Sequence, residues 1–166
     1  MTTAFDLFEE IVRRTKAPAI TITATFDAAE EPKSPLHPFE LRNVHPDMPA
    51  KVRKLFDDGH GAEATFHAFK FVEKVVQKHS GSREIGRKLM MNVFSRTNPI
   101  IKLNGLANPS EEDEQDGYQF MFAGSVAAIR NPGGHEITLS DDPDVCLDHL
   151  AFASLLLRRL ERAGYK

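Results

Sequence analysis

Apolar side chains recur every three or four positions through most of the chain after residue 43. Phe66, Phe69, Val72 and Val76 show the pattern clearly, and it predicts a helix over residues 60–78, because such positions share one helical face. The same spacing predicts further helices, over residues 47–57, 84–94, 117–130 and 143–163. Helices are therefore expected to dominate the chain beyond residue 43.

Polar residues and glycines mark the expected ends of these helices. Asp47 and Asp142 are placed to act as N-caps, and a proline follows Asp142 at the first helical position, where a missing N–H does no harm. The polar segment Ser80-Gly81-Ser82 is expected to close the helix before it. Pro132 disfavours helical backbone at the residue before it, so Arg130 is expected to end its helix.

The first part of the chain has a different pattern. Residues 4–16 predict a short amphipathic helix, and the alternating, β-branched residues 19–26 predict an extended strand-like segment. Residues 27–38 contain three prolines and are typical of an irregular linker. We therefore divide the chain into an N-terminal helix with an extended arm, residues 1–43, and a helical domain, residues 44–166.

Composition limits the possible roles. The 166 residues carry 24 acidic and 21 basic side chains, a net charge of −3, which argues against tight, non-specific nucleic-acid binding but leaves room for a small catalytic site. The single cysteine, Cys146, cannot form an internal disulfide and fits a reducing cytoplasm. No apolar run approaches the length of a membrane span, and no apolar leader is visible at the N-terminus. We expect a cytoplasmic protein without membrane contact.

The most informative chemistry lies at the end of the helix predicted over residues 117–130. Arg130 and Asn131 close this helix, and His135 follows a proline and two glycines. An arginine can bind phosphate oxygens bidentately, a histidine can transfer a proton near neutral pH, and the asparagine can orient either group. These groups suffice to cleave RNA without a metal or cofactor. The alternative is structural: Arg130 pairs with a carboxylate, and Asn131 and His135 cap helix ends.

The six residues from Arg130 to His135 resemble the signature of the HEPN superfamily, an arginine and a histidine separated by four to six residues, often with asparagine after the arginine. Other stretches resemble, in order, the Ymh-like family of this superfamily. They are LFDDGH at 55–60, FHAFK at 66–70, LMMNVFS at 89–95, FAG at 122–124, IRNP at 129–132 and ASLLLRRL at 153–160. The resemblance covers residues 44–163.

The resemblance implies an all-α, HEPN-like helical bundle that pairs into a homodimer. It further implies a metal-independent endoribonuclease that cleaves RNA through the 2′-hydroxyl at the dimer cleft, with Arg130, Asn131 and His135 as catalytic residues. A toxin-like or anti-phage role, restrained by an antitoxin or another partner protein, would accompany this activity. Such bundles also serve as non-catalytic dimerisation, RNA-binding or partner-interaction modules, and this second role stays open.

Three other groups have both a structural and a functional interpretation. Lys70, Lys74 and Lys78 lie four positions apart and form either a solvated surface or an RNA-facing one. The acidic residues Glu111, Glu112, Asp113, Glu114 and Asp116 either favour a helix start through the helix dipole or crowd together as metal ligands, although without the spacing of an EF-hand. His149, within the last helix, is expected to be a half-buried packing residue.

Overall fold

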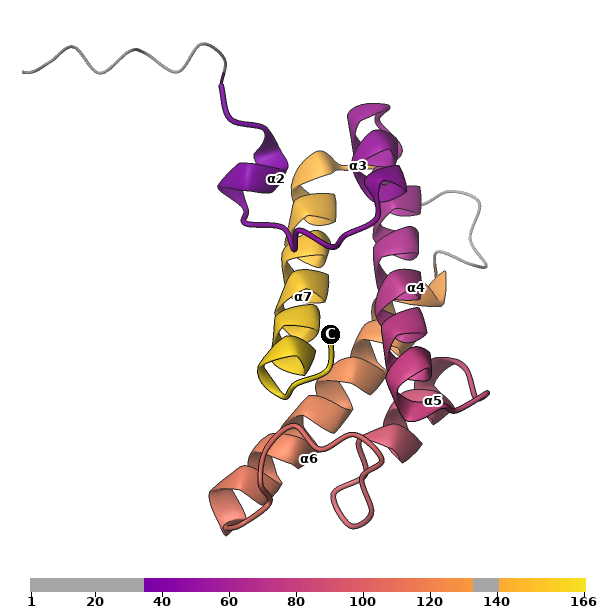
Figure 1. Cartoon of the computed structure of the whole chain (residues 1–166). Coiled ribbons are helices and arrows are strands. Elements are labelled where there is room, and N and C mark those ends of the chain that lie inside the picture. Colours follow the sequence, from indigo (N-terminus) through magenta and orange to yellow (C-terminus); the bar gives the residue numbers. More distant parts are fainter. Residues whose placement is uncertain (1–34, 133–140) are drawn as a thin grey trace, which may run out of the picture. The chain divides into compact units, whose positions relative to one another are not determined.

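The computed structural model describes residues 35–132 and 141–166 and divides the chain into two units, Met1–Pro35 and Leu36–Lys166. The helix predicted at residues 4–16 and the extended segment predicted at 19–26 lie outside the described residues. Within the second unit, the described residues form helices and no strand (Figure 1). The predicted all-α fold is therefore confirmed for this part of the chain.

The helices follow one another with short connections. They are α2 (Pro38–Leu41), α3 (Ala50–Asp57), α4 (Gly61–Ser80), α5 (Gly86–Val93), α6 (Pro109–Ser125), the π-helix η1 (Val126–Arg130) that continues α6, and α7 (Pro143–Arg162).

A parallel pair of helices, α4 and α7, forms the centre of the bundle (Figure 1). Gly61 opens α4 beside Cys146 near the start of α7, and a side chain at Gly61 would meet the Cys146 Cβ at 3.3 Å. Further along both helices, the rings of Phe69 and Phe152 pack with centroids 6.0 Å apart. Each contact advances along both helices in the same direction, so the two N-termini lie at the same end.

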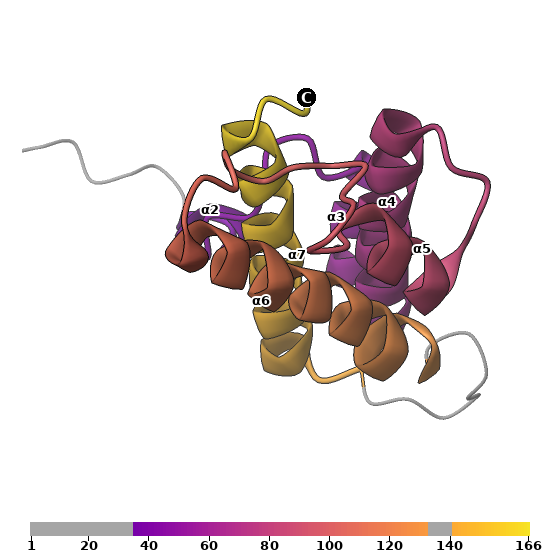
Figure 2. The same cartoon turned by 90° about the horizontal axis from the view of Figure 1, so that it is seen from below.

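The helices α5 and α6 cover one side of this pair, and α6 crosses it at an angle (Figure 2). The rings of Phe94, just after α5, and Phe122 on α6 stack at 4.2 Å with an interplanar angle of 14°. Leu89, Met90 and Val93 of α5 are fully buried in the same core. Met90 is thus a core residue.

One buried amide ties the segment between α5 and α6 to the bundle. Gln115 accepts a hydrogen bond from the Leu103 backbone N–H at 2.9 Å and donates to the carbonyls of Phe94 and Ile101 at 3.1 Å. Ile101 and Leu103 are buried. The connector therefore lies against the bundle, because a side-chain amide replaces the backbone partners that a loop lacks.

Most predicted helix ends are confirmed. Asp142 accepts hydrogen bonds from the N–H groups of Asp144 and Val145 at the start of α7. Gly81 has φ 67° and ends α4, as the left-handed cap requires.

Two helix starts differ from the prediction. Asp47 does not cap α3, which begins at Ala50 after Pro49; its backbone N–H instead donates to His45 Nδ1 at 3.2 Å, within a turn. The helix predicted from residue 117 begins at Pro109, because Asn108 accepts from the Glu111 N–H and acts as its N-cap. The acidic residues 111–116 therefore belong to the first turns of a helix rather than to a loop.

Residues 36–43, which the sequence pattern assigns to the arm, pack on the helices of the second unit. Phe39 in α2 is buried, and its ring lies 5.3 Å from that of Phe56 in α3. His37 contacts Asp57 at 2.7 Å, and Arg42 donates to Asp148 of α7 at 2.8 Å. Among the described residues, no helix combines the length and the apolar character needed to span a bilayer.

The core on α6 gives a direct test of this packing. Phe122→Ala is expected to lower the free energy of unfolding by about 3–5 kcal/mol, because it removes a fully buried ring and leaves a cavity. Leu155→Ala is the control: Leu155 lies on α7 with 41% of its surface exposed, so the change should cost about 1 kcal/mol or less. Urea denaturation measures both, and equal losses would contradict the arrangement of α6.

Candidate functional site

The helix that carries Arg130 ends in a π-helical turn. After Ser125 the backbone widens over Val126–Arg130, and the Asn131 N–H donates to the Val126 carbonyl, five residues back, at 2.9 Å. Arg130 is therefore the last residue of η1, as predicted. The expected cause is wrong, however, because Asn131 keeps helical backbone angles, φ −65° and ψ −44°, although Pro132 follows it. Single π-helical turns inside α-helices occur frequently at functional sites because they redirect the side chains that follow them.

The guanidinium of Arg130 is held on three sides. Its Nη2 lies 3.6 Å from Glu73 Oε1 on α4, and its Cζ lies 5.5 Å from the centroid of the Phe66 ring, also on α4. Its Nη1 donates to Asn131 Oδ1 at 3.2 Å. With 22% of the side chain exposed, the guanidinium is fixed by protein contacts but still reaches the surface.

Glu73 is the key partner of this arginine. Its side chain is 3% exposed, and its second oxygen, Oε2, accepts a hydrogen bond from the Gly86 backbone N–H at 2.8 Å. Gly86 opens α5 with φ 66°, a backbone conformation that favours glycine, and lies beside Val126 of η1. One carboxylate therefore joins α4, α5 and η1, and Arg130 supplies the charge that a buried carboxylate needs.

The same arginine has donor capacity left over. Its Nε is buried and makes no hydrogen bond within the described residues. Arginine carries five N–H donors, and the contacts to Glu73 and Asn131 engage only part of them. A bound anion with several oxygens, such as a phosphate, could accept from the exposed part of this fork.

A second cation lies close to Arg130. The Lys70 Nζ is 5.8 Å from the Phe66 ring centroid, so Phe66 contacts both cations. Lys70 is exposed and forms no ion pair within the described part of the chain. Arg130, Lys70 and Glu73 together carry a formal net charge of +1.

The structure describes two of the three predicted catalytic residues. Arg130 and Asn131 lie together and are hydrogen-bonded to each other. His135 lies within residues 133–140, outside the described residues.

Two histidines outside the motif have lowered pKa values, His149 through burial and His67 through burial together with the charges of Lys51 and Lys70. His149 is half-buried, as predicted.

The acidic residues at the start of α6, for which a metal site was the alternative interpretation, have structural partners. Arg96 pairs with Glu112 at 2.8 Å and with Asp113 at 3.2 Å, and Arg159 of α7 pairs with Glu114 at 3.0 Å. Asn108 and the helix N-terminus account for the rest of this segment. The helix-start interpretation therefore explains these acidic residues.

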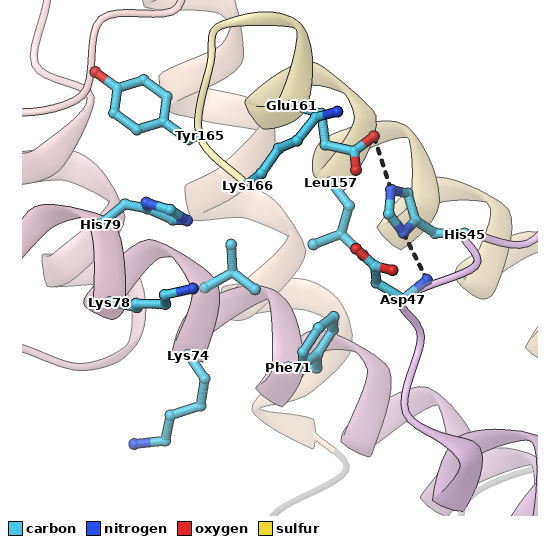
Figure 3. A pocket seen from close by; sticks show the side chains of 11 residues that line it. His45, Asp47, Phe71, Lys74, Lys78, His79, Leu157, Glu161, Tyr165 and Lys166 are labelled. Atoms are coloured by element: carbon cyan, nitrogen blue, oxygen red, sulfur yellow. Dashed lines mark hydrogen bonds and ion pairs between the residues drawn. The ribbon is translucent and has the colours of Figure 1, made fainter.

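The described residues bring together one other group with the composition of a metal site. His45, Asp47 and Glu161 offer ligand atoms within 4.8 Å of one another, at the edge of a cavity (Figure 3). The sequence did not predict this group, because Glu161 lies more than a hundred residues after His45 and Asp47. Phe66 and Glu73 were missed as well, although Glu73 falls beside Phe69, Val72 and Val76 on the apolar face of α4, where a charge requires a partner.

The family comparison agrees with the sequence resemblance. A family model described as "Protein of unknown function (Hypoth_ymh)" matches residues 42–160, well over half of the chain, and confirms the Ymh-like resemblance predicted over residues 44–163. Comparison with curated proteins and with solved structures gave no match. The matched region contains Phe66, Glu73, Gly86, Arg130 and Asn131.

The contact between Arg130 and Glu73 can be measured by a double-mutant cycle. Glu73→Gln keeps an acceptor for the Gly86 N–H but removes the charge, and it should lower the free energy of unfolding by about 1–3 kcal/mol because Arg130 loses its counter-charge. Adding Arg130→Met to this variant should cost less than Arg130→Met alone, with a coupling of about 1 kcal/mol.

The control is Glu112→Gln, whose partner Arg96 and own side chain are both more than 40% exposed, so its cost should stay within about 0.5 kcal/mol. Urea denaturation gives each value. A Glu73→Gln loss no larger than that of Glu112→Gln would show that the buried carboxylate does not hold the site together.

Proposed function

The chain belongs to the Hypoth_ymh family, and we propose that it is a metal-independent endoribonuclease of the HEPN type, acting as a homodimer in the cytoplasm. The observation that carries the proposal is the arrangement at Arg130: a guanidinium fixed by Glu73 and Phe66, bonded to Asn131, and still partly exposed. A prepositioned charge of this kind stabilises a transition state without reorganising during the reaction.

The proposed reaction uses the RNA's own nucleophile. His135 takes the proton of a 2′-hydroxyl, and the 2′ oxygen attacks the adjacent phosphorus. Arg130 binds the phosphate oxygens as negative charge builds on them, and Asn131 positions the arginine or the ribose. The bond from phosphorus to the 5′ oxygen breaks, and that oxygen receives a proton from the second copy of His135. The products are a 2′,3′-cyclic phosphate and a free 5′-hydroxyl.

The local charge at the site supports RNA as the substrate. Lys70 beside Phe66 adds a cation next to Arg130, which offsets the net charge of −3 carried by the whole chain. Phosphate contacts made by these two cations would position a nucleic acid without reading its sequence. DNA, without the 2′-hydroxyl, would resist cleavage.

The proposed biological setting follows from the same resemblance. A ribonuclease without base contacts that select one target would damage cellular RNA, so we propose a toxin-like or anti-phage role in which an antitoxin or another partner protein restrains it.

A second function is favoured by one specific contact. The ion pair between Arg130 and the buried Glu73 is also what a purely structural arginine would form. In that case the chain would be a non-catalytic dimerisation, RNA-binding or partner-interaction module, and Asn131 would serve only as the cap that follows η1.

Cleavage of a mixed RNA pool in the presence of EDTA decides between the two functions. The unaltered chain should generate cyclic-phosphate ends, and His135→Ala and Arg130→Ala should each reduce the rate by about 100-fold or more. Asn131→Ala should have a smaller effect, because the asparagine orients the reacting groups without transferring a proton.

Arg162→Ala is the matched control, since Arg162 is exposed at the end of α7 and outside the motif. Its rate should equal that of the unaltered chain. If the unaltered, folded chain leaves RNA intact, or if all variants cut equally, Arg130 and His135 are not catalytic and the module function stands.

The homodimer has its own test. Phe120 is exposed on α6, and the small residues Gly124, Ala127 and Ala128 are exposed on the same helix and η1, leading toward Arg130. We propose this face as the dimer contact, so Phe120→Glu should convert the dimer into a monomer in sedimentation velocity and abolish cleavage. Leu155→Glu, at an exposed apolar position on α7, should leave the dimer intact; a dimer that persists in Phe120→Glu would rule out this face.

A further inference from the structure

The surface beside Arg130 continues along α4 to His67. The rings of Phe66 and His67 contact each other edge to face, with centroids 5.6 Å apart and planes at 83°. The centroid of the same Phe66 ring lies 5.5 Å from the Arg130 guanidinium and 5.8 Å from the Lys70 ammonium. Phe66 therefore joins His67 and Lys70 to Arg130 in one continuous patch.

Within this patch, the imidazole of His67 is available to a ligand. Its side chain is half-buried, and neither ring nitrogen forms a hydrogen bond or an ion pair with a described residue. A neutral imidazole carries one N–H donor and one acceptor nitrogen. A molecule bound at the patch can thus accept a hydrogen bond from His67 without displacing a protein contact.

The charges around His67 decide the sign of the ligand. Burial lowers the pKa of His67 most, and the charges of Lys51 on α3 and Lys70 on α4 lower it further. Glu63, one turn earlier on α4, opposes them, but it raises this pKa by less than either lysine lowers it. The field that disfavours a proton on His67 favours an anion at the same place.

The two lysines are free to bind such an anion. Lys51 and Lys70 are both exposed, and neither forms an ion pair with a described residue. The other lysines of α4 differ, since Lys74 donates to Gln77 at 2.9 Å and, like Lys78, lines the cavity of Figure 3. The row of lysines on α4 is therefore divided, and Lys70 is its member in the patch.

We propose that Lys51, His67 and Lys70 form a second phosphate subsite, which binds the RNA phosphate adjacent to the one held by Arg130. The inference rests on the proposed function, because it requires an RNA strand at Arg130. One imidazole donor and two ammonium groups suit a phosphate, whose oxygens carry negative charge and accept several hydrogen bonds. Because phosphate contacts do not read the bases, the subsite guides a single strand across α3 and α4 to Arg130 whatever its sequence.

Two oligomers that differ by one phosphate test the subsite on the full chain. We would follow amide NMR signals during titration with the dinucleotide and the trinucleotide of 2′-deoxythymidine, which lack the 2′-hydroxyl and therefore stay intact. A choice of two binding registers makes the trinucleotide only about twofold tighter, whereas an occupied subsite should make it about fivefold tighter or more. Lys51→Met and His67→Ala should each reduce this gain to about twofold and leave the dinucleotide affinity unchanged. The gain should also shrink as salt is raised, because it comes from charge.

Lys78→Met is the matched control, because Lys78 lies two turns after Lys70 on the same helix and lines the cavity instead. This variant should keep the full gain. If the unaltered chain shows no more than the twofold gain, or if Lys51→Met or His67→Ala keeps the larger one, the subsite is overturned and the ribonuclease proposal stands. If neither oligomer binds, or if Arg130→Ala binds the dinucleotide as well as the unaltered chain does, the subsite is overturned together with the phosphate-binding role of Arg130.

Discussion

Burying the carboxylate of Glu73 among three helical elements obliges the chain around it to supply both a positive charge and a backbone donor. Arg130 supplies the charge from the end of η1, and Gly86 supplies the N–H from the start of α5. The positions of α5 and η1 against α4 therefore follow from one charged group. Phe66 completes the arrangement by covering the guanidinium from the side. The residue that holds Arg130 is thus also a residue that holds the bundle together.

Local chemistry explains most of what could be predicted from the sequence. Asp142 followed by proline, and Gly81 after a polar helix end, act through groups one to four residues away, so the pattern alone locates both ends. Asp47 shows where this reasoning fails. It has the right side chain for an N-cap, but the turn from His45 to Met48 engages its backbone and Pro49 delays the helix. A competing local hydrogen bond is invisible in residue type alone.

The contacts at the candidate site depend on distant segments, and here the sequence was informative only in part. The end of the helix at Arg130 was predicted, but Pro132 is not its cause, because Asn131 keeps helical backbone angles. Glu73 could have been recognised as a charge on an apolar helix face, but no sequence pattern identifies Arg130 as its partner. His45 and Glu161 meet only because α7 folds back beside the loop before α3. Such pairs follow from topology, which neither composition nor spacing encodes.

The parallel course of α4 and α7 has a kinetic consequence. Two parallel helices cannot be joined by a tight turn, so α5, α6 and η1 all lie within the loop that the central pair closes. Closing a long loop costs entropy before its contacts can form, and proteins rich in such distant contacts fold more slowly than simple antiparallel bundles. Pairing of Gly61 with Cys146 and of Phe69 with Phe152 requires α7, which follows the other described helices along the chain. On a ribosome, the central pair of α4 and α7 would therefore form only after α7 has emerged.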